Sequence, residues 1–469
     1  MIKKLDSDTM KRKTNGPERE TPPNLLFVFA DQLGAAYMGC YGHPQVQTPN
    51  LDRLAGESVF FRNAYAATPL CTPFRGTLFT GRYPVQTGIW RNSYRIPVSE
   101  TTLAELFNEA GYATSYVGKW HLAGPPRKTW VPPIERAGFQ DFVGWDCGHV
   151  RHINQEYFDG DDPEILKMPG HETDAMTDIA RERLRRCAEG ENPFCMFVSY
   201  QAPHPFCEPP DEYLDLYRDR SLSYRPTVDH DARFTGYGEE SAEMPVREWT
   251  ERYFGEISHL DAAIGRLLGE LEGLGFADDT VVVFSSDHGD MGGCRGLFEK
   301  AVPYEEASWI PLIVRLPGQE KGRETDALFS SVDFLPTLLG LCELPPAGSA
   351  EGVDYAPLLR SESDAERREH LIMQLEDWSC IRSGDIKLTL DPEGTIPREL
   401  YRLSDDPFEQ TNLVAEAEEQ RTVEELQETY VSWLEDARTR VGNVAEASMV
   451  SPALRESDAD AQGGGNKTI

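Results

Sequence analysis

The sequence predicts an α/β fold in which helices flank a large mixed, mostly parallel sheet, with a smaller C-terminal α+β subdomain built on a short antiparallel sheet. Continuous apolar runs of strand length, at residues 24–30 and 280–286, are typical of parallel strands buried on both faces. Segments with apolar residues at helical spacing, such as 249–274, lie between such runs. After about Ser361 short strands follow at 380–382, 386–390 and 400–403, and then a helix at 417–440.

The 469 residues suffice for two domains, which we expect at 22–362 and 363–445. Residues 1–21 are a charged tail without an apolar run, so they predict neither a secretory signal nor a membrane span, and we expect the protein in the cytoplasm. The Gly-rich residues 446–469 should be disordered. Nine cysteines without a CxxC pair argue against a disulfide framework and a structural zinc site, and fit a reducing compartment.

The formal net charge is −33 and the sequence pI is about 4.7, which argues against nucleic acid or an acidic membrane surface as a partner. The negative electrostatic field of the protein also repels an anionic substrate unless salt screens it. At 1 M salt the Debye length is only about 3 Å, so the screening is strong. Arginine is much commoner than lysine among the basic residues. We interpret this balance as adaptation to a salty cytoplasm; an ordinary acidic protein is the alternative.

The first predicted strand, 24–30, ends in Asp31 and Gln32. Open α/β sheets bind their ligands at the carboxyl ends of central strands, so these oxygens are candidate metal ligands. A helix cap or turn is the alternative role for Asp31. A short helix at 48–55, with a first-turn proline, and a strand at 59–64 lead to the next motif.

Residues 71–82, CTPFRGTLFTGR, place the Cys71 thiol just before a predicted helix that ends at Gly81. The free N–H groups and dipole of a helix N-terminus favour an anion. Arg75 adds a planar cation that can bind the oxygens of a tetrahedral oxyanion. The motif therefore indicates a sulfate or phosphate ester as ligand, and a buried structural cysteine is the alternative.

The runs CTPFR and LFTGR resemble the signature of the type I, formylglycine-dependent sulfatases of the alkaline phosphatase superfamily. The resemblance implies an alkaline-phosphatase-like fold. It also implies that a formylglycine-generating maturation enzyme oxidises Cys71 to Cα-formylglycine, whose hydrate is the nucleophile. Asp31 and Gln32 fall at the family's metal-ligand positions, although many members have a second aspartate in place of Gln32.

A helix at 101–109 and a strand at 112–121 come next, and the strand carries Lys119 and His121 on one face, two residues apart. Such a pair can bind an anion and exchange a proton. The run GKWH resembles the family, in which the lysine contacts the nucleophile and the sulfate and the histidine helps to turn over the intermediate. A solvated lysine and a core histidine are the alternative.

Residues 125–170 are rich in Pro, Gly and Asp and predict an irregular insertion, in which Trp130 and Trp145 serve packing and His149 and His152 have no assigned role. A helix at 174–186 and a buried strand at 194–200 follow. His204 lies between two prolines, which hold it in a rigid segment suited to contact a sulfate oxygen or the leaving group. A polar loop histidine is the alternative.

The strand at 280–286 ends in Asp287 and His288, a second pair of candidate metal ligands. With Asp31, Gln32 and the modified Cys71 they would form a mainly oxygen-lined site for Ca²⁺, or alternatively Mg²⁺ or Mn²⁺. The imidazole leaves the metal identity more open. Lys300 falls at the family's position for a lysine that binds sulfate and assists the leaving group. A strand at 311–315 and a helix at 332–338 complete the large domain.

These observations predict a sulfuric ester hydrolase that cleaves a sulfate monoester of a small aryl, alkyl or carbohydrate substrate. The alternatives are a phosphonate monoester hydrolase or phosphodiesterase of the same superfamily, and a non-catalytic protein that binds sulfated glycans. A dinuclear zinc phosphatase is disfavoured because a second cluster of His and Asp ligands is not evident. The candidate catalytic residues are Cys71, Arg75, Lys119, His121, His204 and Lys300, and the candidate metal ligands are Asp31, Gln32, Cys71, Asp287 and His288.

Overall fold

A computed structural model describes residues 22–125, 129–147, 151–236, 243–362 and 365–441. The predicted tails at 1–21 and 446–469, and His149, lie outside the described residues. The predicted domain boundaries stay predictions.

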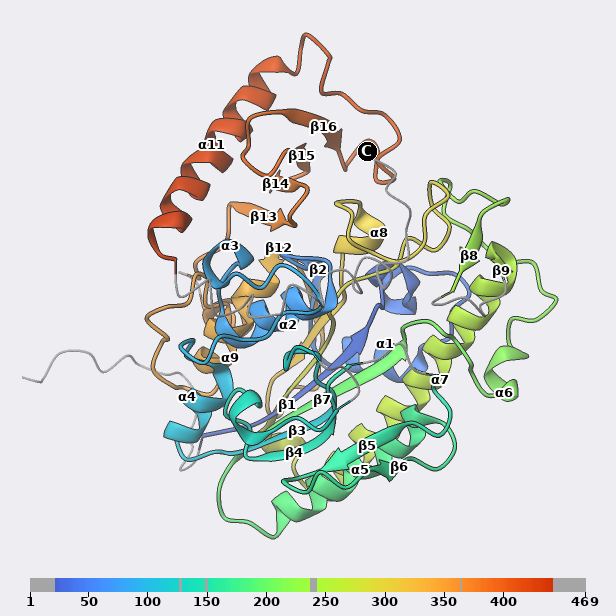
Figure 1. The fold of residues 1–469 in the computed structure, drawn as a ribbon, viewed down its shortest axis with the longest axis vertical. Helices are drawn as coiled ribbons and strands as arrows, with labels where there is room; N and C mark the ends of the chain where they lie inside the picture. The colour runs from blue at the N-terminus through green and yellow to red at the C-terminus, as the bar shows by residue number, and fades with distance from the viewer. Residues whose placement is uncertain (1–21, 126–128, 148–150, 237–242, 363–364, 442–469) are drawn as a thin grey trace, which may run out of the picture.

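The large domain is built on a ten-stranded sheet with the order β12-β2-β11-β10-β1-β7-β3-β4-β5-β6 (Figure 1). Its centre is parallel and comprises β10 (Thr280–Ser286), β1 (Asn24–Asp31), β7 (Phe194–Pro203), β3 (Ala113–Lys119) and β4 (Asp141–Trp145). Of the outer strands, β11 (Leu312–Arg315) runs antiparallel to β10 and β2 (Val59–Tyr65), β12 (Arg323–Ser330) runs parallel to β2, and β5 (Glu156–Asp159) and β6 (Leu166–Lys167) are antiparallel. The predicted large, mostly parallel sheet is confirmed.

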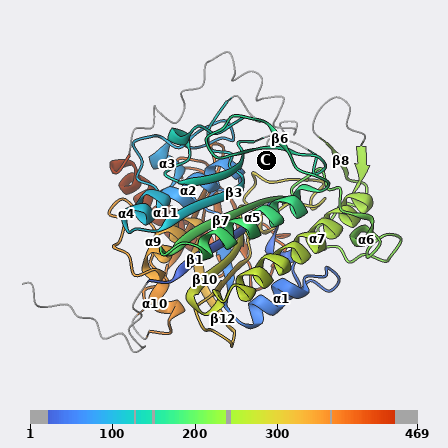
Figure 2. The same ribbon diagram turned by 90° about the horizontal axis from the view of Figure 1, so that it is seen from below.

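Both faces of this sheet are covered by helices (Figure 2). In β1, Leu26 and Val28 belong to the core on one face, and Phe27 and Phe29 to the core on the other. The first core contains α1 (Pro49–Gly56), α5 (Glu172–Ala188) and α7 (Val246–Gly273); the second contains α2 (Cys71–Thr80), α4 (Leu103–Glu109) and α9 (Phe334–Leu341). Burial on both faces explains why these strands are apolar throughout.

The C-terminal subdomain carries an antiparallel sheet of β13 (His370–Gln374), β14 (Ser379–Ser383), β15 (Ile386–Leu390) and β16 (Pro397–Arg402), and α11 (Gln420–Thr439) packs on it (Figure 1). A buried ion cluster links it to the large domain. Lys387 Nζ lies 2.8 Å from a carboxylate oxygen of Glu305, in α8 (Glu305–Ser308), and 2.8 Å from one of Glu409. The predicted antiparallel sheet is confirmed, with β13 in addition.

The insertion at 125–170 is more regular than predicted. It contributes β4, β5 and β6, so the expectation of irregular structure was wrong for these segments. β4 is only five residues long and contains Gly144, whose missing side chain admits the Gly118 carbonyl: an added Cβ would lie 2.0 Å from that oxygen. Trp145 is buried in the core, as its predicted packing role requires.

The remaining helices and strands are short: α3 (Pro84–Thr87), α6 (Asp211–Leu214), β8 (Arg233–Thr235), β9 (Glu243–Pro245) and α10 (Ala356–Leu359). Among the described residues, no helix combines the length and apolar character that crossing a bilayer requires.

Candidate active site

Four predicted ligands meet at the carboxyl ends of β1 and β10. These strands are adjacent and parallel, with Ala30 opposite Ser286, so Asp31 and Asp287 leave the sheet side by side. Together with Cys71 and His288 they form a fully buried group whose ligand atoms all lie within 4.8 Å of one another. Cys71, the first residue of α2, places its Sγ 3.1 Å from His288 Nε2 and 3.6 Å from Asp31 Oδ1. The thiol therefore faces the other ligand atoms.

The imidazole of His288 presents a lone pair to this group. Its Nδ1 lies 3.0 Å from the Gly289 carbonyl, which makes Nδ1 the donor and leaves Nε2 without hydrogen. Burial, with the nearby charge of Lys300, lowers the pKa of His288 to about 3. Nε2 then faces Asp287 Oδ1 at 3.4 Å and Asp31 Oδ1 at 3.9 Å, so its lone pair points toward two carboxyl oxygens. This donor set fits a bound cation.

The two carboxylates are held in different states by their surroundings. Burial acts to raise the pKa of Asp31, but Lys119, with its Nζ 2.6 Å from Asp31 Oδ2, is the main cause that holds this pKa well below its usual value. Burial and the neighbouring Asp31 raise the pKa of Asp287 to about 7. A divalent cation would stabilise both as carboxylates.

Arg75 contacts both carboxylates, and its predicted role as a donor to the oxyanion stays a prediction. Its Nη1 donates to the Lys119 carbonyl at 2.6 Å and to Ser199 Oγ at 2.8 Å. Its Nη2 donates to Asp31 at 3.1 Å and to Asp287 at 3.4 Å. With both terminal nitrogens engaged and no exposed surface, Arg75 acts here as a positioning residue for the two aspartates.

Gln32, Lys300 and His204 form a chain along one side of the site. Lys300 Nζ donates to Gln32 Oε1 at 2.5 Å and lies 3.1 Å from His204 Nε2. His204 Nδ1 is 2.6 Å from the Pro205 carbonyl and donates to it, so Nε2 accepts the hydrogen bond from Lys300. The chain brings together three predicted residues from distant parts of the sequence.

Sequence reasoning missed Asp290. This buried carboxylate accepts a hydrogen bond from Gln32 Nε2 and from the Gly292 and Glu299 N–H groups, the last two at 2.6 and 3.1 Å. It thereby orients the amide of Gln32, so that the amide oxygen points to Lys300. Its position three residues after Asp287 was the available signal.

His121 does not continue the strand, because β3 ends at Lys119 and His121 has φ 60°. The shared face predicted for Lys119 and His121 from strand alternation was therefore wrong. The His121 backbone instead donates to the Asp146 carbonyl at 2.6 Å and accepts the Thr72 hydroxyl at 2.7 Å. His121 is buried beside the segment that begins with Cys71.

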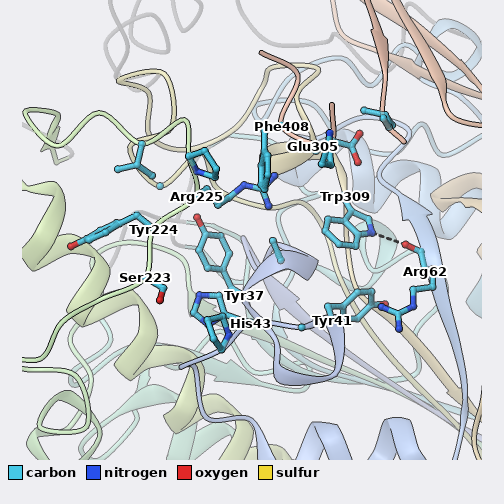
Figure 3. Close-up of a pocket in the computed structure, with 18 of the residues that line it drawn as sticks. Tyr37, Tyr41, His43, Arg62, Ser223, Tyr224, Arg225, Glu305, Trp309 and Phe408 are labelled. Carbon is cyan, nitrogen blue, oxygen red and sulfur yellow. Dashed lines mark hydrogen bonds between the residues drawn. The ribbon is translucent and has the colours of Figure 1, made fainter. Parts of the chain in front are cut away.

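A separate cavity of about 650 Å³ opens between the large domain and the C-terminal subdomain (Figure 3). Aromatic side chains surround it, among them Tyr37, Tyr41, Trp309 and Phe408. None of the predicted catalytic or metal-binding residues lines it. The sequence did not predict this cavity, because its walls come from segments without a common motif.

Comparison with known proteins decides the family. The profile of the sulfatase family matches residues 23–344, and the profile named for the C-terminal part of N-sulphoglucosamine sulphohydrolase matches residues 293–436. The chain belongs to the sulfatase family. The resemblance seen in the sequence is thus confirmed.

Named relatives agree with this assignment. The sulfatase is 34% identical over 423 residues to an ulvan-active sulfatase of Formosa agariphila, covering 87% of this chain and 80% of the relative. It is 30% identical over 442 residues to human arylsulfatase A, covering 84% and 83%. A solved structure from work on the metabolism of multiple glycosaminoglycans by Bacteroides thetaiotaomicron has a TM-score of 0.79 at 26% identity, covering 88% and 97%. The protein is an enzyme that hydrolyses sulfate esters.

Proposed function

We propose that this sulfatase hydrolyses a carbohydrate sulfate monoester, with Cys71 converted to Cα-formylglycine and a divalent metal held by Asp31, Gln32, Asp287 and His288. The observation that carries the proposal is the position of Cys71 Sγ, 3.1 Å from His288 Nε2 and 3.6 Å from Asp31 Oδ1. A group at this position lies within reach of a metal bound by its neighbours.

The unmodified thiol is a poor nucleophile in this setting. Burial, together with the negative Asp31, raises the pKa of Cys71 to about 12, so the sulfur keeps its proton at neutral pH. A formylglycine hydrate would supply an oxygen nucleophile and a second hydroxyl, through which the enzyme can release sulfate. The environment of Cys71 therefore favours a hydrated aldehyde over the unmodified thiol as the nucleophile.

The metal ligands would be two carboxylates, an amide oxygen and an imidazole. Oxygen donors suit Ca²⁺, Mg²⁺ and Mn²⁺, and the nitrogen of His288 suits Mn²⁺ best of the three. We keep Ca²⁺ as the first choice because three of the four ligands are oxygen donors. When bound, the ion would lower the pKa of a coordinated hydroxyl and draw charge from the sulfate oxygens.

The two lysines are placed to bind the sulfate. Burial disfavours their charge, but Asp31 raises the pKa of Lys119 above its usual value, and Cys71 and Glu299 do the same for Lys300. Both therefore stay cationic at neutral pH and can stabilise charge on the sulfuryl oxygens. Lys300, hydrogen-bonded to His204 Nε2, can hold a proton for the leaving oxygen. We assign His121, beside the Cys71 segment, to proton removal during turnover.

A sugar is the favoured carrier of the sulfate. The profile over residues 293–436 is named for a sulphohydrolase of N-sulphoglucosamine, and one relative is named ulvan-active. A small sulfated substrate, a formylglycine-generating maturation enzyme as partner, a cytoplasmic location and independence from nucleic acid and membranes remain predictions.

Peptide mass spectrometry tests the nucleophile. The peptide that contains Cys71, from protein made in its native host, should be lighter than the thiol form by about 18 Da, the change from thiol to aldehyde. An active native enzyme with an intact Cys71 thiol would contradict the proposal. An intact thiol without hydrolysis would favour the sulfated-glycan-binding alternative.

Relative rates test the reaction. The enzyme with Cys71 converted to formylglycine should hydrolyse 4-nitrophenyl sulfate and sulfated monosaccharides faster than phenylphosphonate monoesters or bis(4-nitrophenyl) phosphate. The reverse order would favour the phosphonate monoester hydrolase or phosphodiesterase alternative. Substitution Cys71→Ala is the control for both substrate classes.

A further inference from the structure

A second group of buried ionisable side chains lies outside the catalytic site. It consists of His152, His171, Glu172 and Glu256, and we call it the histidine–glutamate cluster; His171 is 6% exposed and the other three are fully buried. Donor atoms of His152, His171 and Glu256 all lie within 4.8 Å of one another. The residues come from the segment before α5, the first turn of α5, and the middle of α7.

The histidine at the centre has a free lone pair. His152 Nε2 is 2.9 Å from the His204 carbonyl and donates to it, so Nδ1 carries no hydrogen. This Nδ1 lies 3.9 Å from Glu172 Oε2 and 4.0 Å from Glu256 Oε1. Within the described part of the chain, His152 Nδ1 and Glu172 Oε2 have no hydrogen-bond partner. Buried polar atoms left in this state are costly, and a bound group would satisfy them.

His171 completes the arrangement. Its ring stacks on that of His152, with centroids 5.3 Å apart, and its Nε2 is 3.3 Å from Glu256 Oε1. Its Nδ1 accepts the Thr173 N–H at 3.2 Å, which leaves the hydrogen of the neutral ring on Nε2. The two rings thus present one nitrogen each toward the same carboxylate.

Without a cation, burial favours the neutral form of all four side chains, and burial together with Glu172 raises the pKa of Glu256 well above its usual value. Burial lowers the pKa of His152 to about 4 and that of His171 to about 2, and it raises the pKa of Glu172 to about 8. Neutral imidazoles are metal ligands as they stand, and carboxylic acids become ligands when a metal displaces their protons.

We propose that the histidine–glutamate cluster binds a divalent transition-metal ion of the zinc class, with His152 Nδ1, His171 Nε2 and the carboxylates of Glu172 and Glu256 as ligands. In a tetrahedral site with bonds of about 2.0–2.1 Å, donor atoms lie about 3.3 Å apart. His171 and Glu256 already have this separation, and the distance of 4.0 Å between His152 and Glu256 closes with a small side-chain shift. Glu172, 3.9 Å from His152 but outside the group of three donors within 4.8 Å of one another, has to move further to become the fourth ligand. Two nitrogen donors favour zinc-class ions over Ca²⁺.

Binding releases protons. The hydrogen on His171 Nε2 moves to Nδ1, where the contact with Thr173 is given up, and the carboxylic acids of Glu172 and Glu256 lose their protons to solvent. The cysteine pattern argued against a structural zinc site, and the proposed site departs from that expectation by using histidine and glutamate ligands instead of cysteine. Through the hydrogen bond from His152 to the His204 carbonyl, the ion fixes the backbone that carries a proposed catalytic residue.

The test is zinc binding by a protein whose catalytic metal site is disabled. The variant Asp287→Asn is stripped with a chelator and titrated with Zn²⁺ alone, with metal content measured by mass spectrometry and the melting temperature by calorimetry. We expect about one bound Zn²⁺ per chain, a raised melting temperature, and visible absorption bands of a tetrahedral site when Co²⁺ replaces Zn²⁺.

Two further substitutions in the same background locate the ion. Adding Glu256→Gln, which keeps the side-chain shape, should weaken Zn²⁺ binding at least about 100-fold. Adding His259→Gln is the matched control, because the His259 ring packs against His171 at 4.5 Å while its Nε2 pairs with Asp174, and this protein should keep the ion. Failure of Asp287→Asn to bind Zn²⁺, or unchanged binding after Glu256→Gln, would overturn the proposal. If Glu256→Gln does not fold, His152→Gln takes its place, with the same expected loss.

Discussion

His204 and Lys300 share a hydrogen bond of 3.1 Å, which predicts that their contributions to catalysis are coupled. Substitutions His204→Gln and Lys300→Met should each lower kcat/KM about 10²- to 10³-fold, because each removes a polar group from the sulfate or leaving-group side. The double variant should lose less than the product of the two, with a coupling energy of about 0.5–3 kcal/mol. Steady-state kinetics on an aryl sulfate measure all three.

Lys321→Met serves as control, since Lys321 is exposed and should leave kcat/KM unchanged. If the loss in kcat/KM of the double variant equals the product of the two single losses, the two residues act independently and the predicted coupling is contradicted.

Asp287 should make binding of the proposed metal depend on pH. Its pKa is raised to about 7 in the metal-free site, first by burial and then by Asp31. The proposed metal would bind the ionised carboxylate, so its affinity should be constant above about pH 7 and fall about tenfold per pH unit below it. Calorimetric titration with Ca²⁺ between pH 5.5 and 8 measures this slope. A constant affinity across that range would mean that Asp287 is already ionised before the metal binds.

At the scale of elements, a side chain of α7 caps the N-terminus of α1. Thr48 makes no side-chain cap, whereas Asp261 accepts N–H groups of Asn50 at 3.2 Å and Leu51 at 2.8 Å. Asp261→Ala should therefore lower the free energy of unfolding by about 1–2 kcal/mol. Urea denaturation followed by circular dichroism measures the change. Asp261→Asn, which keeps an acceptor oxygen, should lose less; equal losses would point to charge rather than capping.

Elements with one dominant pattern could be predicted from sequence. The strand at 280–286 was predicted to the residue, since it is apolar and buried on both faces, and the long helix α7 carries an apolar stripe throughout. β12 was missed because it begins Arg-Glu-Thr-Asp and alternates in burial at the sheet edge. β4 was missed because five residues with a glycine give too short a signal.

Some site residues could likewise be predicted from sequence, and others could not. The proximity of Asp31, Asp287 and His288 could be predicted from sequence, because the carboxyl ends of adjacent parallel strands meet at one edge of the sheet. The orientation of Arg75 depends on acceptors contributed by β3 and β7, and the turn at His121 depends on a backbone angle that no spacing encodes. The histidine–glutamate cluster joins three segments without a shared motif.

At the scale of the whole molecule, the net charge of −33 predicts a stability that rises with salt. Repulsion among exposed carboxylates acts against the folded state, and 1 M KCl reduces its range to about 3 Å. The melting temperature should be higher in 1 M than in 0.05 M KCl, and the KM for an anionic sulfate ester should be lower. A melting temperature that falls with KCl would contradict adaptation to a salty cytoplasm.

All ten residues of α2 are buried, and Cys71 is 1% exposed. A maturation enzyme could not reach Cys71 once the chain has folded, so the oxidation proposed for Cys71 would have to precede folding. The two processes then compete in time during synthesis. With the proposed nucleophile, the share of active molecules would be set by the ratio of their rates, and a chain that folds first would stay inactive.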